Sequence, residues 1–158
     1  MFINDKWLVD RTYGIFSYNK LDFVRYYDKL INRVVMTMLK IDDNTVLVGT
    51  SNGLYKYSDG NLTLCNVLAK STVDSISFAE TSVDGYPTYY LTSGSKVYKT
   101  KDKNFILADL LFDLSTVSTN INKITNVKKF GKKSYVFGTN IGVLNTYDKY
   151  RLVDTWSK

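Results

Sequence analysis

Four similar segments recur along this 158-residue chain, and they constrain its fold more than any other feature. The segments begin at Trp7, Val46, Tyr89 and Tyr135, so successive copies are offset by 39, 43 and 46 residues. Offsets of this size are typical of β-propeller blades and other β-repeats. The chain is therefore expected to build several copies of one supersecondary unit.

The second copy shows the internal order of the unit most clearly. An apolar run at 46–48 leads into the turn at 50–53, and a second run follows at 54–57. Asp59-Gly60 then predicts a type I′ hairpin turn, because both residue types accept positive φ, and 62–64 returns as another strand. A further apolar segment precedes each of the last three copies, at 35–39, 74–78 and 124–127. Each unit is thus expected to be a four-stranded antiparallel sheet.

The first strand of the core motif is apolar on both faces, as in Val46-Leu47-Val48 and Tyr135-Val136-Phe137. A sheet with one solvated face would alternate apolar and polar residues. Burial of both faces is expected when each sheet lies between two neighbours, which favours a radial stack. A β-sandwich and a linear β-solenoid remain alternatives. Helical periodicity is absent except at 107–114, which could carry one helical turn.

The segment from Val46 to Tyr57 resembles the repeat of the two-component-regulator type propellers, whose blades run apolar-x-apolar-Gly-Thr-x-x-Gly-Leu-x-x-Tyr. The segment from Phe137 to Val143 is similar. The first and third copies depart from that pattern: Asp10 and Thr92 stand where Gly is expected, and Lys96 replaces the second Gly. The resemblance implies a propeller fold and says little about function, because propellers carry many unrelated activities.

We therefore predict an all-β protein of about four antiparallel four-stranded repeats, forming a small or partial β-propeller. The predicted units span about 1–30, 31–70, 71–114 and 120–158 of a single domain, 1–158. Such a ring must either close within the chain or leave sheet edges for a partner or a second copy, since exposed edges invite pairing.

The formal charge of +6 raises the question of an anionic partner. Its densest cluster is the predicted hairpin with Lys128, Lys129, Lys132 and Lys133, which could contact nucleic-acid phosphates around Phe130. The alternative is a solvated turn whose lysines keep a sheet edge soluble. The basic residues are mostly Lys, whereas Arg is the better fork for phosphates.

Catalysis is not expected from this composition. The chain has no His, so the commonest general base and metal ligand is missing and Cys65 has no His to activate it. There is neither a Cys cluster for zinc nor a P-loop, and the turns and arginine trio of sialidase-type propellers are absent. Asp42, Asp43 and Asp59 lie in turns where Asp serves the backbone. We expect no enzyme activity, no metal and no cofactor.

Two other groups of residues could contact a ligand. The repeat turns carry Thr50, Ser51, Asn52, Thr139 and Asn140, which with nearby tyrosines could bind a glycan as a lectin does. The tyrosines considered are Tyr13, Tyr26, Tyr27, Tyr86, Tyr89, Tyr90, Tyr147 and Tyr150. Most of them lie in predicted strands, where packing between sheets is the competing role.

The sequence favours a non-catalytic module that makes protein–protein contacts. The N-terminal residues lack a signal-peptide pattern, and no apolar run approaches the length of a membrane helix. Synthesis in a cytoplasm without membrane insertion is therefore expected. The composition, rich in Lys, Asn, Tyr and Ile, suits an AT-rich genome, and a structural subunit of a larger particle such as a phage virion would fit.

Overall fold

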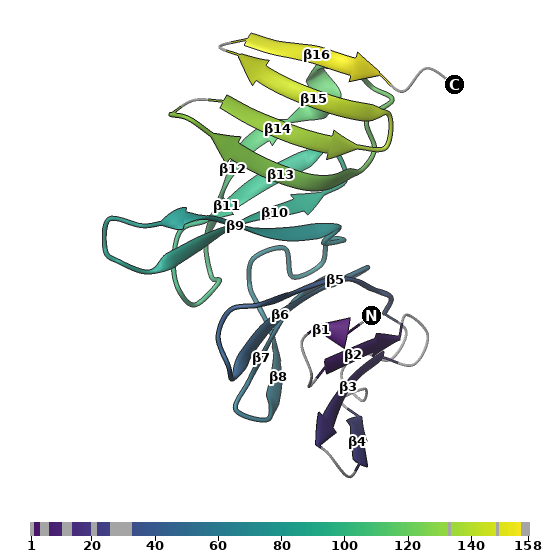
Figure 1. The fold of residues 1–158 in the computed structure, drawn as a ribbon, viewed down its shortest axis with the longest axis vertical. Helices are drawn as coiled ribbons and strands as arrows, with labels where there is room; N and C mark the ends of the chain where they lie inside the picture. Colours follow the sequence, from purple (N-terminus) through teal and green to yellow (C-terminus); the bar gives the residue numbers. More distant parts are fainter. Residues whose placement is uncertain are drawn as a thin grey trace. The chain divides into compact units, whose positions relative to one another are not determined.

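The computed structural model describes the backbone of residues 2–3, 7–10, 14–19, 22–25, 33–132, 134–147 and 149–155. Side chains are described for residues 33–132 and 134–146. The chain divides into two compact units, Met1–Val73 and Asp74–Lys158, and each contains two sheets (Figure 1). The placement of both units in one domain stays a prediction.

Unit 1 holds two four-stranded antiparallel sheets, each with its strands in sequence order. The first sheet contains β1 Phe2–Ile3, β2 Trp7–Asp10, β3 Gly14–Asn19 and β4 Asp22–Arg25. The second contains β5 Val35–Lys40, β6 Thr45–Thr50, β7 Gly53–Ser58 and β8 Asn61–Leu64. Between β7 and β8, Asp59 and Gly60 have φ values of 50° and 82°. The predicted turn with two positive φ angles is confirmed.

Unit 2 repeats this arrangement in two further sheets. The third sheet contains β9 Ser75–Thr81, β10 Pro87–Ser93, β11 Lys96–Thr100 and β12 Ala108–Asp113. The fourth contains β13 Ile124–Phe130, β14 Ser134–Thr139, β15 Gly142–Tyr147 and β16 Lys149–Thr155. The predicted fold class is confirmed: the protein is all-β, with four antiparallel four-stranded repeats. Its closure into a propeller stays a prediction.

The expected helical turn at 107–114 is displaced toward the C-terminus. Residues Ala108–Asp113 form β12, which pairs with β11, and a single 3₁₀ turn follows at Leu114–Thr116. Asp113 caps that turn, because its carboxylate accepts a hydrogen bond from the Ser115 amide at 3.1 Å. Strand pairing therefore prevails over the short apolar periodicity.

The sheets of unit 2 pack face to face through a common hydrophobic core. The third sheet contributes Tyr90 and Val97, and the fourth contributes Val127, Phe137 and Leu144. Phe112 is edge-on to both Tyr135 and Phe137, with ring centroids 4.9 and 5.2 Å apart. Stacking of successive repeats, rather than one isolated sheet, thus buries the apolar side chains.

Two of the three departures from the resembling repeat, Asp10 and Lys96, have local explanations. Asp10 pairs with Gly14, as Thr50 pairs with Gly53, so Asp10 occupies the Thr position and not the Gly position. Three residues separate the paired positions in the first copy, and two separate them in the second. In the third copy the positive φ lies at Gly94, at 58°, and Lys96 therefore needs no glycine freedom.

Candidate functional site

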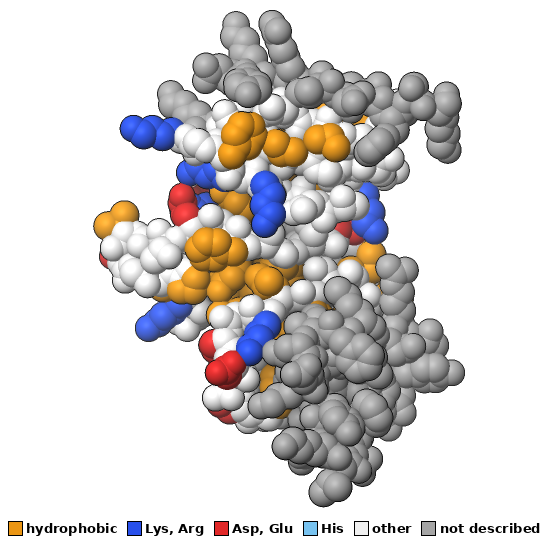
Figure 2. Space-filling model, viewed as in Figure 1, with side chains coloured by type: hydrophobic (Ala, Val, Ile, Leu, Met, Phe, Trp, Pro, Cys, Tyr) orange, Lys and Arg blue, Asp and Glu red, His pale blue; other side chains and the backbone are white. Residues whose placement is uncertain are grey.

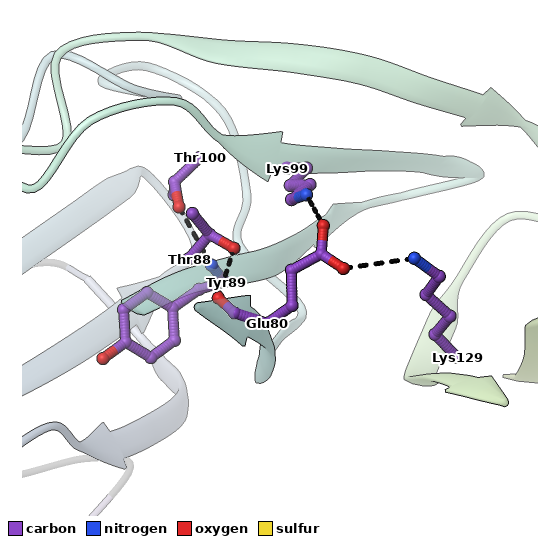
Figure 3. A network of polar contacts seen from close by, with 6 residues as sticks. All are labelled: Glu80, Thr88, Tyr89, Lys99, Thr100 and Lys129. Atoms are coloured by element: carbon purple, nitrogen blue, oxygen red, sulfur yellow. Dashed lines mark hydrogen bonds and ion pairs between the residues drawn. The ribbon is translucent and has the colours of Figure 1, made fainter. Parts of the chain in front are cut away.

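A carboxylate between two lysines joins the third and fourth sheets. Glu80 on β9 accepts hydrogen bonds from Lys99 on β11 and from Lys129 on β13, the latter at 3.1 Å (Figure 3). Both ammonium groups hold the pKa of Glu80 below its usual value. The Glu80 side chain is 41% exposed, so this is a partly solvated bridge between two sheets.

Backbone contacts hold this bridge in place. The Thr88 hydroxyl donates to the Glu80 carbonyl at 2.7 Å, and the Tyr89 amide donates to the Thr100 hydroxyl at 2.9 Å (Figure 3). A bulge between Thr88 and Tyr89 shifts the register of β10 against β9 at this point. Glu80 thus links the third sheet to the fourth within unit 2.

The Glu80 bridge bears on whether the lysines of the predicted hairpin form one basic surface. Lys129 is engaged with Glu80, whereas Lys128 lies exposed on the other face of β13 and Lys132 lies exposed in the following turn. Lys133 lies outside the described residues. Lys128 and Lys129 therefore do not belong to one continuous basic surface.

The threonines of the repeat turns satisfy backbone groups. The Thr50 hydroxyl donates to the Gly53 carbonyl at 2.8 Å and accepts from the Asn52 amide at 3.1 Å. Thr139 does the same with the Gly142 carbonyl at 2.8 Å and the Ile141 amide at 3.2 Å. The same Gly-Thr-x-x-Gly sequence therefore folds into the same turn in both units.

The remaining turn candidates divide into bound and exposed side chains. Asn140 accepts from the Asn122 and Lys123 amides at 3.0 and 3.1 Å and donates to the Asn120 carbonyl. The Ser51 hydroxyl accepts from the Val34 amide at 3.0 Å. Asn52 lies exposed at the tip of its turn. Of the five candidates, Asn52 is the one whose side chain has no hydrogen bond recorded among the described residues.

The tyrosines that the structure describes serve mainly in packing. Tyr89 and Tyr90 are buried, and burial raises the pKa of Tyr90. Tyr86 donates its hydroxyl to the Lys101 carbonyl. Of Tyr147 and Tyr150 the backbone alone is described, and Tyr13, Tyr26 and Tyr27 lie outside the described residues.

The predicted backbone role of the turn aspartates is seen at Asp42, whose carboxylate accepts from the Asn44 amide at 2.8 Å. The contact of Asp43 is instead an ion pair with Lys40 at 2.6 Å. Asp102, which the sequence reasoning missed, accepts from three amides of the loop before β12. Its hydrogen bonds lower its pKa although burial opposes them. The Asp102-x-Asn104 pattern of an Asx-type turn could have identified it.

Large apolar side chains reach the surface of the third sheet and are the most unusual feature outside the core. We call the face that carries Phe78, Tyr89, Tyr98 and Leu110 the Phe78 face, since the strand register places these residues on one side. Phe78 and Leu110 are each 52% exposed, and Ile106 and Leu107 in the adjoining loop are exposed too. Figure 2 shows apolar side chains at the surface among the lysines.

A rigid aromatic base supports this surface. The Phe78 ring is edge-on to Tyr89 at 6.3 Å, and Tyr89 lies against Phe105 at 5.9 Å. Phe105 and Tyr89 are both buried. Phe78 is therefore held in place by a well-packed sheet.

No helix in the described ranges is long and apolar enough to cross a membrane. Comparison with protein-family models and with curated proteins finds no significant match to this chain.

Proposed function

We propose that this protein is a non-catalytic binding and assembly module that makes protein–protein contacts. The observation that supports the proposal most is the Phe78 face. Large apolar side chains that stay exposed on a rigid surface are typical of sites where proteins dock. Aromatic anchors that are already held in place lose little conformational entropy on binding.

The polar candidates give weaker support to the other functions considered. Thr50, Thr139 and Asn140 already use their hydrogen-bonding groups on the backbone, and a lectin needs such groups for its sugar. Lys129 is paired with Glu80. A role as a structural subunit of a larger particle, such as a phage virion, belongs to the same proposal.

Photo-crosslinking tests the proposal in the cells that produce the protein. A benzophenone amino acid at Leu110 should yield one defined protein adduct, while the same probe at exposed Lys103 should not. The substitution Phe78→Ser should abolish the Leu110 adduct, and the purified adduct partner should bind the wild-type chain. Absence of any adduct at Leu110, together with salt-dependent nucleic-acid binding or a specific glycan-array hit, would contradict the proposal.

A further inference from the structure

The fourth sheet has one face that is apolar in part and open. We call it the Val136 face; the strand register places Lys128, Val136, Asn145 and Val143 on it. Val143 is 37% exposed, and Val136 is half-buried. Phe130, two residues after Lys128 on β13, is 41% exposed. The Asn145 Oδ1 atom is buried there and has no hydrogen-bond partner among the residues whose side chains are described.

The equivalent face of the third sheet shows what such a face packs against. In the aligned repeats, Tyr90 and Val97 correspond to Val136 and Val143. Tyr90 is 1% exposed and Val97 fully buried, because both lie in the core shared with the fourth sheet. The Ser77 hydroxyl also donates to the Val127 carbonyl across this interface, at 3.2 Å. In unit 2, the equivalent face of the third sheet is therefore covered by another sheet of the same repeat.

The glycine position of the repeat points to the same conclusion. A Cβ atom on Gly49 would lie 2.8 Å from the Val73 carbonyl, in the segment that follows the second sheet. In the third sheet, Thr92 replaces this glycine and donates to the Ile124 carbonyl at 2.8 Å, again in the segment leading onward. Around Gly138 the near atoms belong to Thr125 and Asn126 of its own sheet. Among the described residues, no onward segment lies against Gly138 as Val73 lies against Gly49.

We propose that the Val136 face binds a sheet of the same repeat from a second copy of this chain. This inference rests on the proposed function and names the partner for one surface. The contact continues the stacking seen between the third and fourth sheets. It would bury Val136 and Val143, and it would bring donors of the incoming sheet close to the Asn145 Oδ1 atom.

The expected contact is small. Four strands spaced about 4.8 Å apart, with about six residues each, present a face of roughly 19 by 20 Å. A single contact of this size covers about 760 Å² on both partners together, below the range of stable protein interfaces, so weak association is expected and the mass must be measured over a concentration series. Light scattering should show a rise from 18.1 kDa toward at least about twice that value.

The double substitution V136K/V143K places two lysines in the proposed contact. It should raise the dissociation constant at least about 100-fold, because it adds two charges to a contact that already has to accommodate Lys128, and unpaired charges are strongly unfavourable when buried. Both positions are partly exposed, so the variant should keep its β circular dichroism. Val83→Lys, at a fully exposed turn residue, is the matched control and should associate like the wild type.

Two results would overturn the inference, and they differ in what they say of the proposed function. A wild-type monomer at every concentration would exclude a second copy as the partner of this face. An oligomer that V136K/V143K leaves intact would show that copies associate through another surface. The proposed assembly function would then still be supported. The Leu110 crosslink tests the proposed function separately from both.

Discussion

Strands β6 and β14 carry the same repeat sequence in the two units, yet they differ in burial. Every residue of β6 is buried, whereas in β14 Phe137 alone is fully buried. Leu47 is completely buried, and Val136, its counterpart, is half-exposed. An apolar pattern on both faces of a strand thus indicates a surface suited to being covered, but it does not decide whether that surface is covered.

The largest difference is expected from truncating the matched side chains. Leu47→Ala should lower the free energy of unfolding by about 2–5 kcal/mol, because it leaves a cavity in a closed core. Val136→Ala should lower the free energy of unfolding by less than about 1 kcal/mol in dilute solution. Urea unfolding followed by circular dichroism measures both. Equal losses would show that the Val136 face is already covered within the monomer.

The repeat glycines offer a second comparison. A Cβ at Gly49 would meet Thr37 Cγ2 at 2.5 Å and the Val73 backbone, so Gly49→Ala should cost about 1–3 kcal/mol through overpacking. At Gly138 the near contact is a single hydroxyl, Thr125 Oγ1 at 2.9 Å, which can rotate away. Gly138→Ala should therefore be the milder change by urea unfolding. The reverse order would mean that Gly138 also faces fixed backbone.

The turn threonines Thr50 and Thr139 allow the same comparison for a single hydroxyl group. Thr50→Val leaves the Asn52 amide and Gly53 carbonyl without their partner in a buried turn, at a cost of about 1–3 kcal/mol. Thr139→Val removes the same two bonds in a partly buried turn, where water can replace them. We expect its shift in thermal midpoint to be the smaller of the two. A larger shift for Thr139→Val would show that its turn is shielded from water.

The smallest effect concerns the Glu80 bridge in unit 2. Its folded pKa is lowered by Lys99 and Lys129, so its contribution is present above the unfolded value of about 4.5 and is lost as pH falls through the folded pKa. Glu80→Gln should therefore lower the free energy of unfolding at pH 7. It should also make that free energy fall less steeply as the pH is lowered. Urea midpoints between pH 7 and pH 3 test this, with Asp59→Asn in an exposed turn as control. Because Glu80 is partly exposed, the difference should shrink in high salt.

Local patterns were sufficient to predict the elements of this fold. The strand that precedes each later repeat appears where the apolar segments indicated, at β5, β9 and β13. The Asp59-Gly60 turn could be predicted because its backbone requirement is local. The helical turn near 107–114 was misplaced, since pairing of β12 with β11 depends on residues outside that segment.

The sequence by itself determined the fold class, the four repeats and their turns, because hydrogen-bonded hairpins depend on residues close together in the chain. The tertiary structure decided which side chains meet: Lys129 with Glu80, 49 residues apart, and the uneven cover of the Leu47 and Val136 positions. These outcomes depend on the stacking of separate sheets, where partners distant in sequence compete for one surface. No pattern within a single repeat contains that information.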